Sequence, residues 1–120
     1  MDCTAKNEFG MVTVTEEVIA TIAGVSAVEC YGIVAMASKR ATDGIVELLG
    51  SENITRGVKT KIAEDKISVD LYIIVQYGVS IAAVARTAME TVKYNIENLT
   101  GMPVVAVNIT VEGIRVEGKK

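Results

Sequence analysis

The sequence predicts an α+β fold, a two-layer sandwich in which two main helices cover one face of a mostly antiparallel sheet. Residues 69–76 and 104–111 alternate apolar and polar side chains, which is typical of strands with one buried face. Residues 81–99, which lie between them, repeat apolar residues every three or four positions, as a helix with one buried stripe does. The full predicted order is strand, helix, an unassigned segment, two hairpin strands, helix and strand.

The chain has the length of one domain, at 120 residues. Residues 1–8 are polar and are expected to be a disordered N-terminus. We therefore expect a single domain over residues 9–117, followed by a charged tail at residues 118–120. No internal repeat or low-complexity stretch divides it further.

A short strand and a helix are predicted at the start of this domain. Residues 10–15 alternate apolar and polar side chains. Thr15 is the expected N-cap of a helix that continues to about Cys30, because Glu16 and Glu17 follow it where the helix dipole favours acidic groups. The stripe expected to face inward comprises Val18, Ile19, Ile22 and Ala23.

The middle of the chain gives a weaker pattern. Residues 31–57 have no clear period, and residues 31–36 fit either a buried strand or a packed loop. Residues 58–62 alternate and predict a half-exposed strand. Residues 64–66 are the expected hairpin turn before the strand at residues 69–76, although they lack the Asn-Gly or Asp-Gly pair that favours such turns.

The second helix has clear end signals. Ser80 is its expected N-cap, Gly101 its left-handed stop, and Pro103 prevents continuation. Glu90 and Lys93 have the spacing of an ion pair on the exposed side. The stripe expected to be buried comprises Ile81, Val84, Ala85, Ala88, Val92, Ile96 and Leu99.

Composition fits an ordered cytoplasmic protein. Half of the residues are hydrophobic and the net charge is −3, so the chain as a whole has no attraction for phosphate backbones or anionic lipid. The N-terminus lacks the apolar core of a signal peptide, and no stretch has the roughly 20 apolar residues of a membrane span. Cys3 and Cys30 are expected to be reduced thiols without a structural role.

The residues needed for catalysis are scarce. The sequence has no histidine, which removes the commonest general base and excludes Ser–His and Cys–His pairs within the chain. It has no glycine-rich phosphate loop, and its two cysteines make no metal-ligand set. We therefore predict no catalytic, cofactor-binding or metal-binding residues and no cofactor.

Two polar residues interrupt apolar strands. Asp70 is expected to lie on the open face of the sheet; if it were covered, it would need a cation such as Lys59, Lys61 or Arg115. Asn108 poses the same question in the last strand, and an open sheet face is again the favoured interpretation.

Nucleic-acid binding is the alternative function, as a KH-like RNA-binding accessory domain. It would depend on a local basic patch at Arg56, Lys59 and Lys61. However, no two glycines have the GxxG spacing of a KH loop, and Tyr72 is the single aromatic residue on the outer face of its strand. These observations disfavour nucleic acid as a partner. A third hypothesis is a carrier of a small molecule or lipid, which would need a cavity.

A protein-binding surface is the leading expectation. Some apolar residues are not obviously buried by a two-layer fold, and a contiguous exposed apolar patch marks a protein contact. Alternatively, residues 31–57 fold over them. The candidate surface comprises Tyr31, Ile33, Met36, Tyr72 and Ile74.

The ordered set of segments also resembles a known family. The matching pieces are the strand at residues 10–14, the helix start EEVIATIAG, the segment YGIVAM at 31–36, the block VDLYI at 69–73 and the strand at 104–111. Together they resemble the alkaline shock proteins, general-stress or envelope-stress-response proteins of Gram-positive and related bacteria.

This resemblance implies a non-enzymatic cytoplasmic protein linked to cell-envelope homeostasis. Members tend to self-associate, and some are held at the membrane by an integral partner protein. The family brings no catalytic motif to carry over. The termini of this chain are short and lack the long charged extensions of some membrane-recruited members.

Overall fold

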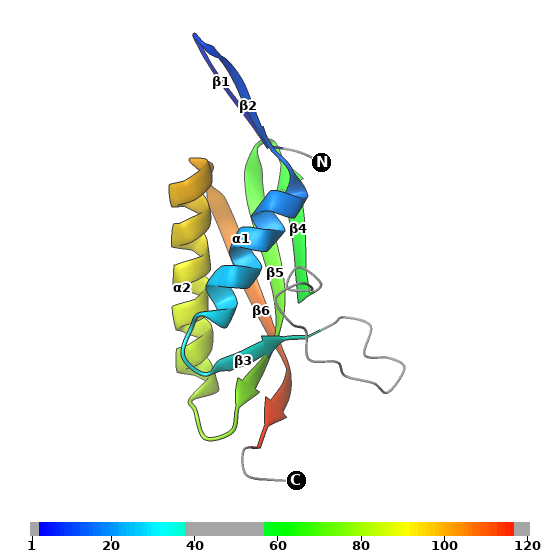
Figure 1. The fold of residues 1–120 in the computed structure, drawn as a ribbon, viewed down its shortest axis with the longest axis vertical. Helices are drawn as coiled ribbons and strands as arrows, with labels where there is room; N and C mark the ends of the chain where they lie inside the picture. Colours follow the sequence, from blue (N-terminus) through cyan, green and yellow to red (C-terminus); the bar gives the residue numbers. More distant parts are fainter. Residues whose placement is uncertain (1–2, 38–56, 117–120) are drawn as a thin grey trace, which may run out of the picture.

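The computed structural model describes residues 3–37 and 57–116. In this part of the chain two helices cover one face of a four-stranded sheet, and a two-stranded hairpin projects from one end (Figure 1). The predicted α+β sandwich is therefore confirmed. In chain order the elements are β1 (Cys3–Asn7), β2 (Gly10–Val14), α1 (Glu16–Val28), β3 (Ile33–Met36), β4 (Val58–Ala63), β5 (Lys66–Gln76), α2 (Ile81–Thr100) and β6 (Val104–Arg115).

The long strand β5 is the centre of the sheet. Along one edge it pairs antiparallel with β4 over its first half and with β3 over its second half. Along the other edge it pairs with β6, and this pair is parallel. Parallel partners need a crossover connection, and α2 supplies it by returning the chain to the end of the sheet where β5 began.

The hydrophobic core lies between the sheet and the two helices. It is aliphatic, as the composition requires, and the inward side chains of β5 form its centre. Where α1 crosses the sheet its buried residues are mostly small, which lets the helix approach the strands closely. The core side chains from β5, α1 and α2 include Ile67, Val69, Leu71, Ile73, Val75, Ile19, Ala23, Ala27, Val84, Ala88, Val92 and Ile96.

Helix α1 begins as predicted, but its buried face differs from the prediction. The Thr15 hydroxyl oxygen accepts a 3.4 Å hydrogen bond from the Val18 backbone N–H, which confirms the N-cap. The helix ends at Val28, two residues earlier than expected. Val18, predicted to face inward, is exposed, whereas Ala20 and Ala27 are buried.

Helix α2 has the predicted caps and a narrower buried stripe. Ser80 caps its first turn, and Gly101 ends it with a φ of 76°. Ile81 and Leu99, at its two ends, are exposed, so the predicted stripe is wrong there. Lys93 pairs with Glu97, at 3.0 Å, and not with Glu90 as expected. The stripe that is fully buried comprises Val84, Ala88, Val92 and Ile96.

Residues 3–14 form a hairpin, here called the N-terminal arm, so the expectation of disorder is wrong for residues 3–8. Strands β1 and β2 pair antiparallel from Cys3–Val14 to Asn7–Gly10. At the tip, the Asn7 side-chain oxygen accepts hydrogen bonds from the backbone N–H groups of Phe9 and Gly10, at 2.7 and 3.2 Å. At the base, Cys3 is fully buried in the core.

The turn between β4 and β5 holds the base of the arm. The predicted hairpin is confirmed, with Glu64 and Asp65 at its tip. Both have positive φ angles, 53° and 62°, as a type I′ turn requires. The Asp65 carboxylate accepts a 3.4 Å hydrogen bond from the Thr4 backbone N–H. A turn and an arm far apart in sequence therefore lie together.

Candidate interaction surfaces

The five residues predicted as an interaction surface do not form one. Ile33 and Met36 are buried in the core, because β3 joins the sheet and turns them toward the helices. Ile74 is also buried, with its Cα paired to that of Ala35 in β3. Tyr31 remains exposed in the turn before β3 and Tyr72 is half-buried, so the predicted patch is wrong as a contiguous surface.

A polar pair lies on the outer face of the sheet. The Asn108 side-chain amide donates a 2.8 Å hydrogen bond to the Asp70 carboxylate, and the two residues are partners in the β5–β6 register. Lys59 lies opposite Asp70 in the β4–β5 register. Asn108 is exposed, as expected for an open sheet face, whereas Asp70 is half-buried.

The lysines considered for RNA binding share a cleft with carboxylates. Lys59 and Lys61 of β4 line a cleft of about 480 Å³ together with Glu16 and Glu17 of α1. The two carboxylates cancel the positive potential of the two lysines, so this cleft does not favour the binding of a phosphate backbone. Arg56, the third residue of that expected patch, lies outside the described residues.

Exposed apolar side chains gather instead on the N-terminal arm. Phe9, at the tip, is 90% exposed, and Met11 and Val12 on β2 are also exposed. Figure 1 shows the arm projecting beyond the ends of the sheet and of both helices. The apolar residues among positions 9–12 could have indicated this surface, but a pattern four residues long does not distinguish an exposed arm from a buried strand.

A second apolar surface lies between the helices. Ile22 and Val25 of α1 and Leu99 of α2 line a groove of about 410 Å³, with Glu29, Asn95 and Asn98 among its polar residues. We call it the α1–α2 groove. The Asn95 side-chain amide donates a 2.8 Å hydrogen bond to the hydroxyl of Ser26, which joins the two helices at the groove.

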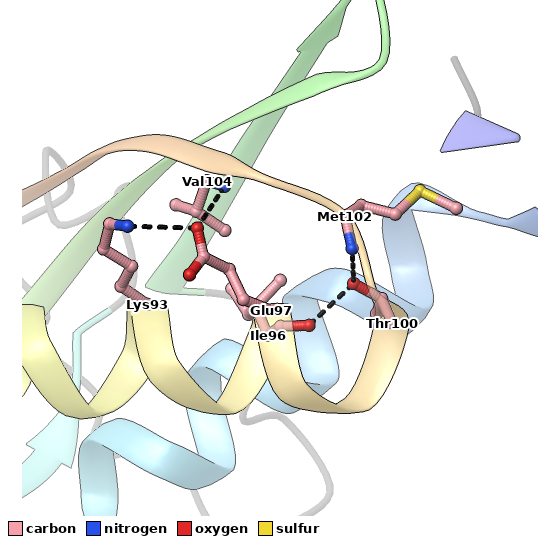
Figure 2. A network of polar contacts seen from close by, with 6 residues as sticks. All are labelled: Lys93, Ile96, Glu97, Thr100, Met102 and Val104. Carbon is pink, nitrogen blue, oxygen red and sulfur yellow. Dashed lines mark hydrogen bonds and ion pairs between the residues drawn. The ribbon is translucent and has the colours of Figure 1, made fainter. Parts of the chain in front are cut away.

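Among the described residues, two titratable groups have shifted pKa values, and both lie at contacts between elements. Burial raises the pKa of the Cys3 thiol, and the nearby Asp65 carboxylate raises it further. The pKa of Glu97 is lowered, first by a hydrogen bond from the Val104 backbone N–H and then by one from Lys93. Figure 2 shows these contacts joining the end of α2 to the start of β6.

Metal-binding clusters and long apolar helices are absent from the described residues. Residues 3–37 and 57–116 contain no group of three or more His, Cys, Asp or Glu side chains placed to hold a metal. In the same ranges every buried side-chain nitrogen or oxygen has a hydrogen-bond partner. Neither described helix combines the length and the apolarity that a membrane-crossing helix requires.

The described residues thus define a small α+β domain with exposed apolar side chains on the N-terminal arm and at the α1–α2 groove. The chain belongs to a protein family that is described as having a cell envelope-related function, and the family model matches residues 4–116. This family fits the resemblance to the alkaline shock proteins. The expected link to the cell envelope is confirmed for the family as a whole, and the family description names no reaction.

Relatives occur in Gram-positive bacteria. The uncharacterized protein YloU of Bacillus subtilis is 44% identical over 117 residues, which covers 97% of this chain and 98% of YloU. The uncharacterized protein Spy1614 of Streptococcus pyogenes serotype M6 is 41% identical, with 92% of each chain covered. The uncharacterized protein YqhY of B. subtilis is 38% identical over 92% of this chain and 81% of its own length.

A solved structure has a similar fold. It is the C-terminal domain of MamM in a copper form, with a TM-score of 0.51 over 88% of this chain and 91% of that one. The two sequences are 12% identical, so the similarity concerns the fold alone.

Proposed function

We propose that this chain is a non-enzymatic interaction protein of the alkaline shock or envelope-stress-response type. It acts in the cytoplasm through protein–protein contacts, including contacts with further copies of itself, and a membrane-anchoring partner places it near the envelope. The family assignment supports the link to the envelope. The absence of histidine from the sequence supports a role without catalysis.

The N-terminal arm is the observation that carries the proposal. An isolated two-stranded hairpin is at best marginally stable in water. This arm also presents Phe9, 90% exposed, at its tip, and a side chain of that size is typical of interface anchors. The base of the arm is fixed by buried Cys3 and by the Asp65 contact, while its tip extends away from the domain. A partner that covers the tip would stabilise the hairpin and bury its apolar side chains.

The test is the oligomeric state of a variant whose arm has lost its apolar side chains. We expect the wild-type protein to exceed its monomer mass of 12.8 kDa in light scattering after gel filtration. Because both side chains are solvent-exposed, the double variant Phe9→Ser, Val12→Ser should fold normally and shift toward the monomer.

The control is Tyr31→Ser, which removes an aromatic side chain of similar exposure, 87%, at a site in the turn before β3. This variant should keep the wild-type mass. A monomeric wild type at all concentrations, or equal masses for the arm variant and the wild type, would refute self-association through the arm.

A further inference from the structure

We propose that the α1–α2 groove is a docking site for a positively charged amphipathic helix of a partner protein. The inference rests on the proposed function in one respect, namely that the chain acts through contacts. The groove is a different surface from the N-terminal arm, so an experiment can refute the groove proposal without refuting self-association through the arm, and the reverse.

Helix α1 is apolar on both sides. Ile19 and Ala23 are buried against the sheet, as expected for a helix in a two-layer fold. On the side away from the core, Val18 and Val25 are 47% and 40% exposed. Exposed apolar side chains on the outer side of a helix indicate a further contact there, and the described chain covers only the inner side of α1.

The apolar residues on this outer side have the spacing at which helices pack. Val18, half-buried Ile22 and Val25 follow one another at four and three positions, so they form a single stripe along α1. Leu99 of α2, 67% exposed, adds an apolar side chain on the opposite wall of the groove. Helix-in-groove recognition uses anchors at this spacing, and a helix of 13 residues offers a contact about 20 Å long.

The groove is formed before any partner binds. The hydrogen bond from Asn95 to Ser26 holds its two walls together, and Ser26 is itself buried. A preformed groove loses little conformational entropy on binding, so more of the contact free energy remains as affinity.

Charge decides which kind of helix fits. Helix α1 and its C-cap contain no Lys or Arg, and their charged residues are Glu16, Glu17 and Glu29. Glu29, at the C-cap, lines the groove itself, whereas Glu17, in the first turn, lies at the cleft that it shares with Lys59 and Lys61. The carboxylate of Glu29, in a groove whose other lining residues are uncharged, favours a partner with Lys or Arg beside an apolar face.

The cations of α2 are directed away from the groove. Lys93 binds Glu97 beside the start of β6, as Figure 2 shows. Arg86 lies nine residues before Asn95, which is two and a half helical turns and therefore the opposite side of α2. The residues that α2 contributes to the groove, Asn95, Asn98 and Leu99, are uncharged.

The probes are three synthetic peptides of equal length, measured by fluorescence anisotropy with the full chain. One is an amphipathic Leu/Ala helix with Lys at both ends and on the polar face. In the second, Glu replaces every Lys, and the third is a scrambled form of the first. We expect binding of the Lys peptide at low salt, weakening as salt rises, and much weaker binding of the other two.

Two groove variants test the site. Val18→Ser, Val25→Ser changes exposed side chains and should weaken binding of the Lys peptide about tenfold. Glu17→Lys, Glu29→Lys should reverse the preference toward the Glu peptide. Glu8→Lys, Glu90→Lys is the matched control: it changes the net charge equally, on the arm tip and on α2, and should preserve the preference. If the Glu17 variant unfolds, Glu29→Lys alone remains usable, since a cation at a helix C-terminus is favourable.

Three results would overturn the proposal. These are failure of the Lys peptide to bind at low salt, equal affinities for the valine variant and the wild type, or equal behaviour of the two charge-reversal variants. An oligomer that the valine variant dissociates and the Lys peptide does not would assign the groove to a second copy instead. The arm variant Phe9→Ser, Val12→Ser should still bind the Lys peptide, whatever its oligomeric mass. That result would show that the groove binds independently of the self-association proposed above.

Discussion

Asn95 and Ser26 are 69 positions apart in sequence, and a 2.8 Å hydrogen bond between their side chains joins the two helices. Ser26 is buried, and its neighbours on the inward side of α1 are apolar. The bond therefore links the two helices by a specific polar contact within an otherwise apolar interface.

Replacing Ser26 tests this bond. Ser26→Ala removes the acceptor and leaves the Asn95 amide half-buried without it, so we expect the free energy of unfolding to fall by about 1 kcal/mol. Urea unfolding followed by circular dichroism measures the change. Asn98→Ala, at a groove residue for which no such bond is seen, is the comparison and should differ little from wild type. Equal stability of the Ser26 variant and the wild type would contradict a role for the bond.

Replacing either of two glycines with similar φ angles by alanine should reduce stability by different amounts. Gly32 and Gly78 have φ angles of +94° and +101°, so either alanine variant incurs left-handed strain of about 1 kcal/mol. A Cβ at Gly32 would also lie 2.7 Å from Val84 Cγ2, whereas nothing lies within 4 Å of one at Gly78. We expect Gly32→Ala to cost about 1–3 kcal/mol more than Gly78→Ala. Thermal unfolding of both variants gives the difference, and equal losses would show that the core adjusts around Gly32.

The turn before β5 offers a stabilising substitution. Glu64 has a φ of 53°, which is unfavourable for a side chain of its type, and asparagine tolerates this region better. We expect Glu64→Asn to raise the midpoint of thermal unfolding by a few degrees. Asp65→Gly relieves similar strain but loses the contact with the Thr4 N–H, so its gain should be smaller. A lower midpoint for Glu64→Asn would contradict this account of the turn.

The carboxylate of Glu97 should make stability depend on pH. Hydrogen bonds from the Val104 N–H and from Lys93 lower its pKa, so the folded protein binds this proton less tightly than the unfolded chain. The contribution of ionised Glu97 to the free energy of unfolding is fully present above the pKa of glutamate in the unfolded chain, about 4.3. It is lost as the pH falls through the lower pKa of the folded state. Urea midpoints of wild type and Glu97→Gln should therefore differ at pH 7 and converge in acid. A difference that is constant with pH would rule out the charged form as the source.

The sequence predicted the features that depend on neighbouring residues. The caps Thr15 and Ser80, the stop at Gly101 and the hairpin turn at Glu64–Asp65 all use local chemistry, and the structure confirms them. The alternation in β5 likewise identified its core side from Val69 to Val75.

Features that depend on distant contacts were predicted less well. The arm is held by Asp65, about 61 residues away from Thr4, and no local pattern indicates that contact. In α1 the apolar residues occupy more than one face, so periodicity could not separate inward Ile19 from exposed Val18. The burial of Ile74 depends on its pairing with β3, in a segment without a clear period.

The position of Cys3 gives the molecule a natural reporter. Its sulfur is fully buried at the junction of arm and domain, and its raised pKa further slows reaction with alkylating reagents. Modification of this thiol therefore requires the arm to lift from the β4–β5 turn, so its labelling rate measures that opening without any engineered probe. A ligand that binds the arm should slow the alkylation of Cys3, whereas a ligand bound only in the α1–α2 groove should leave its rate unchanged.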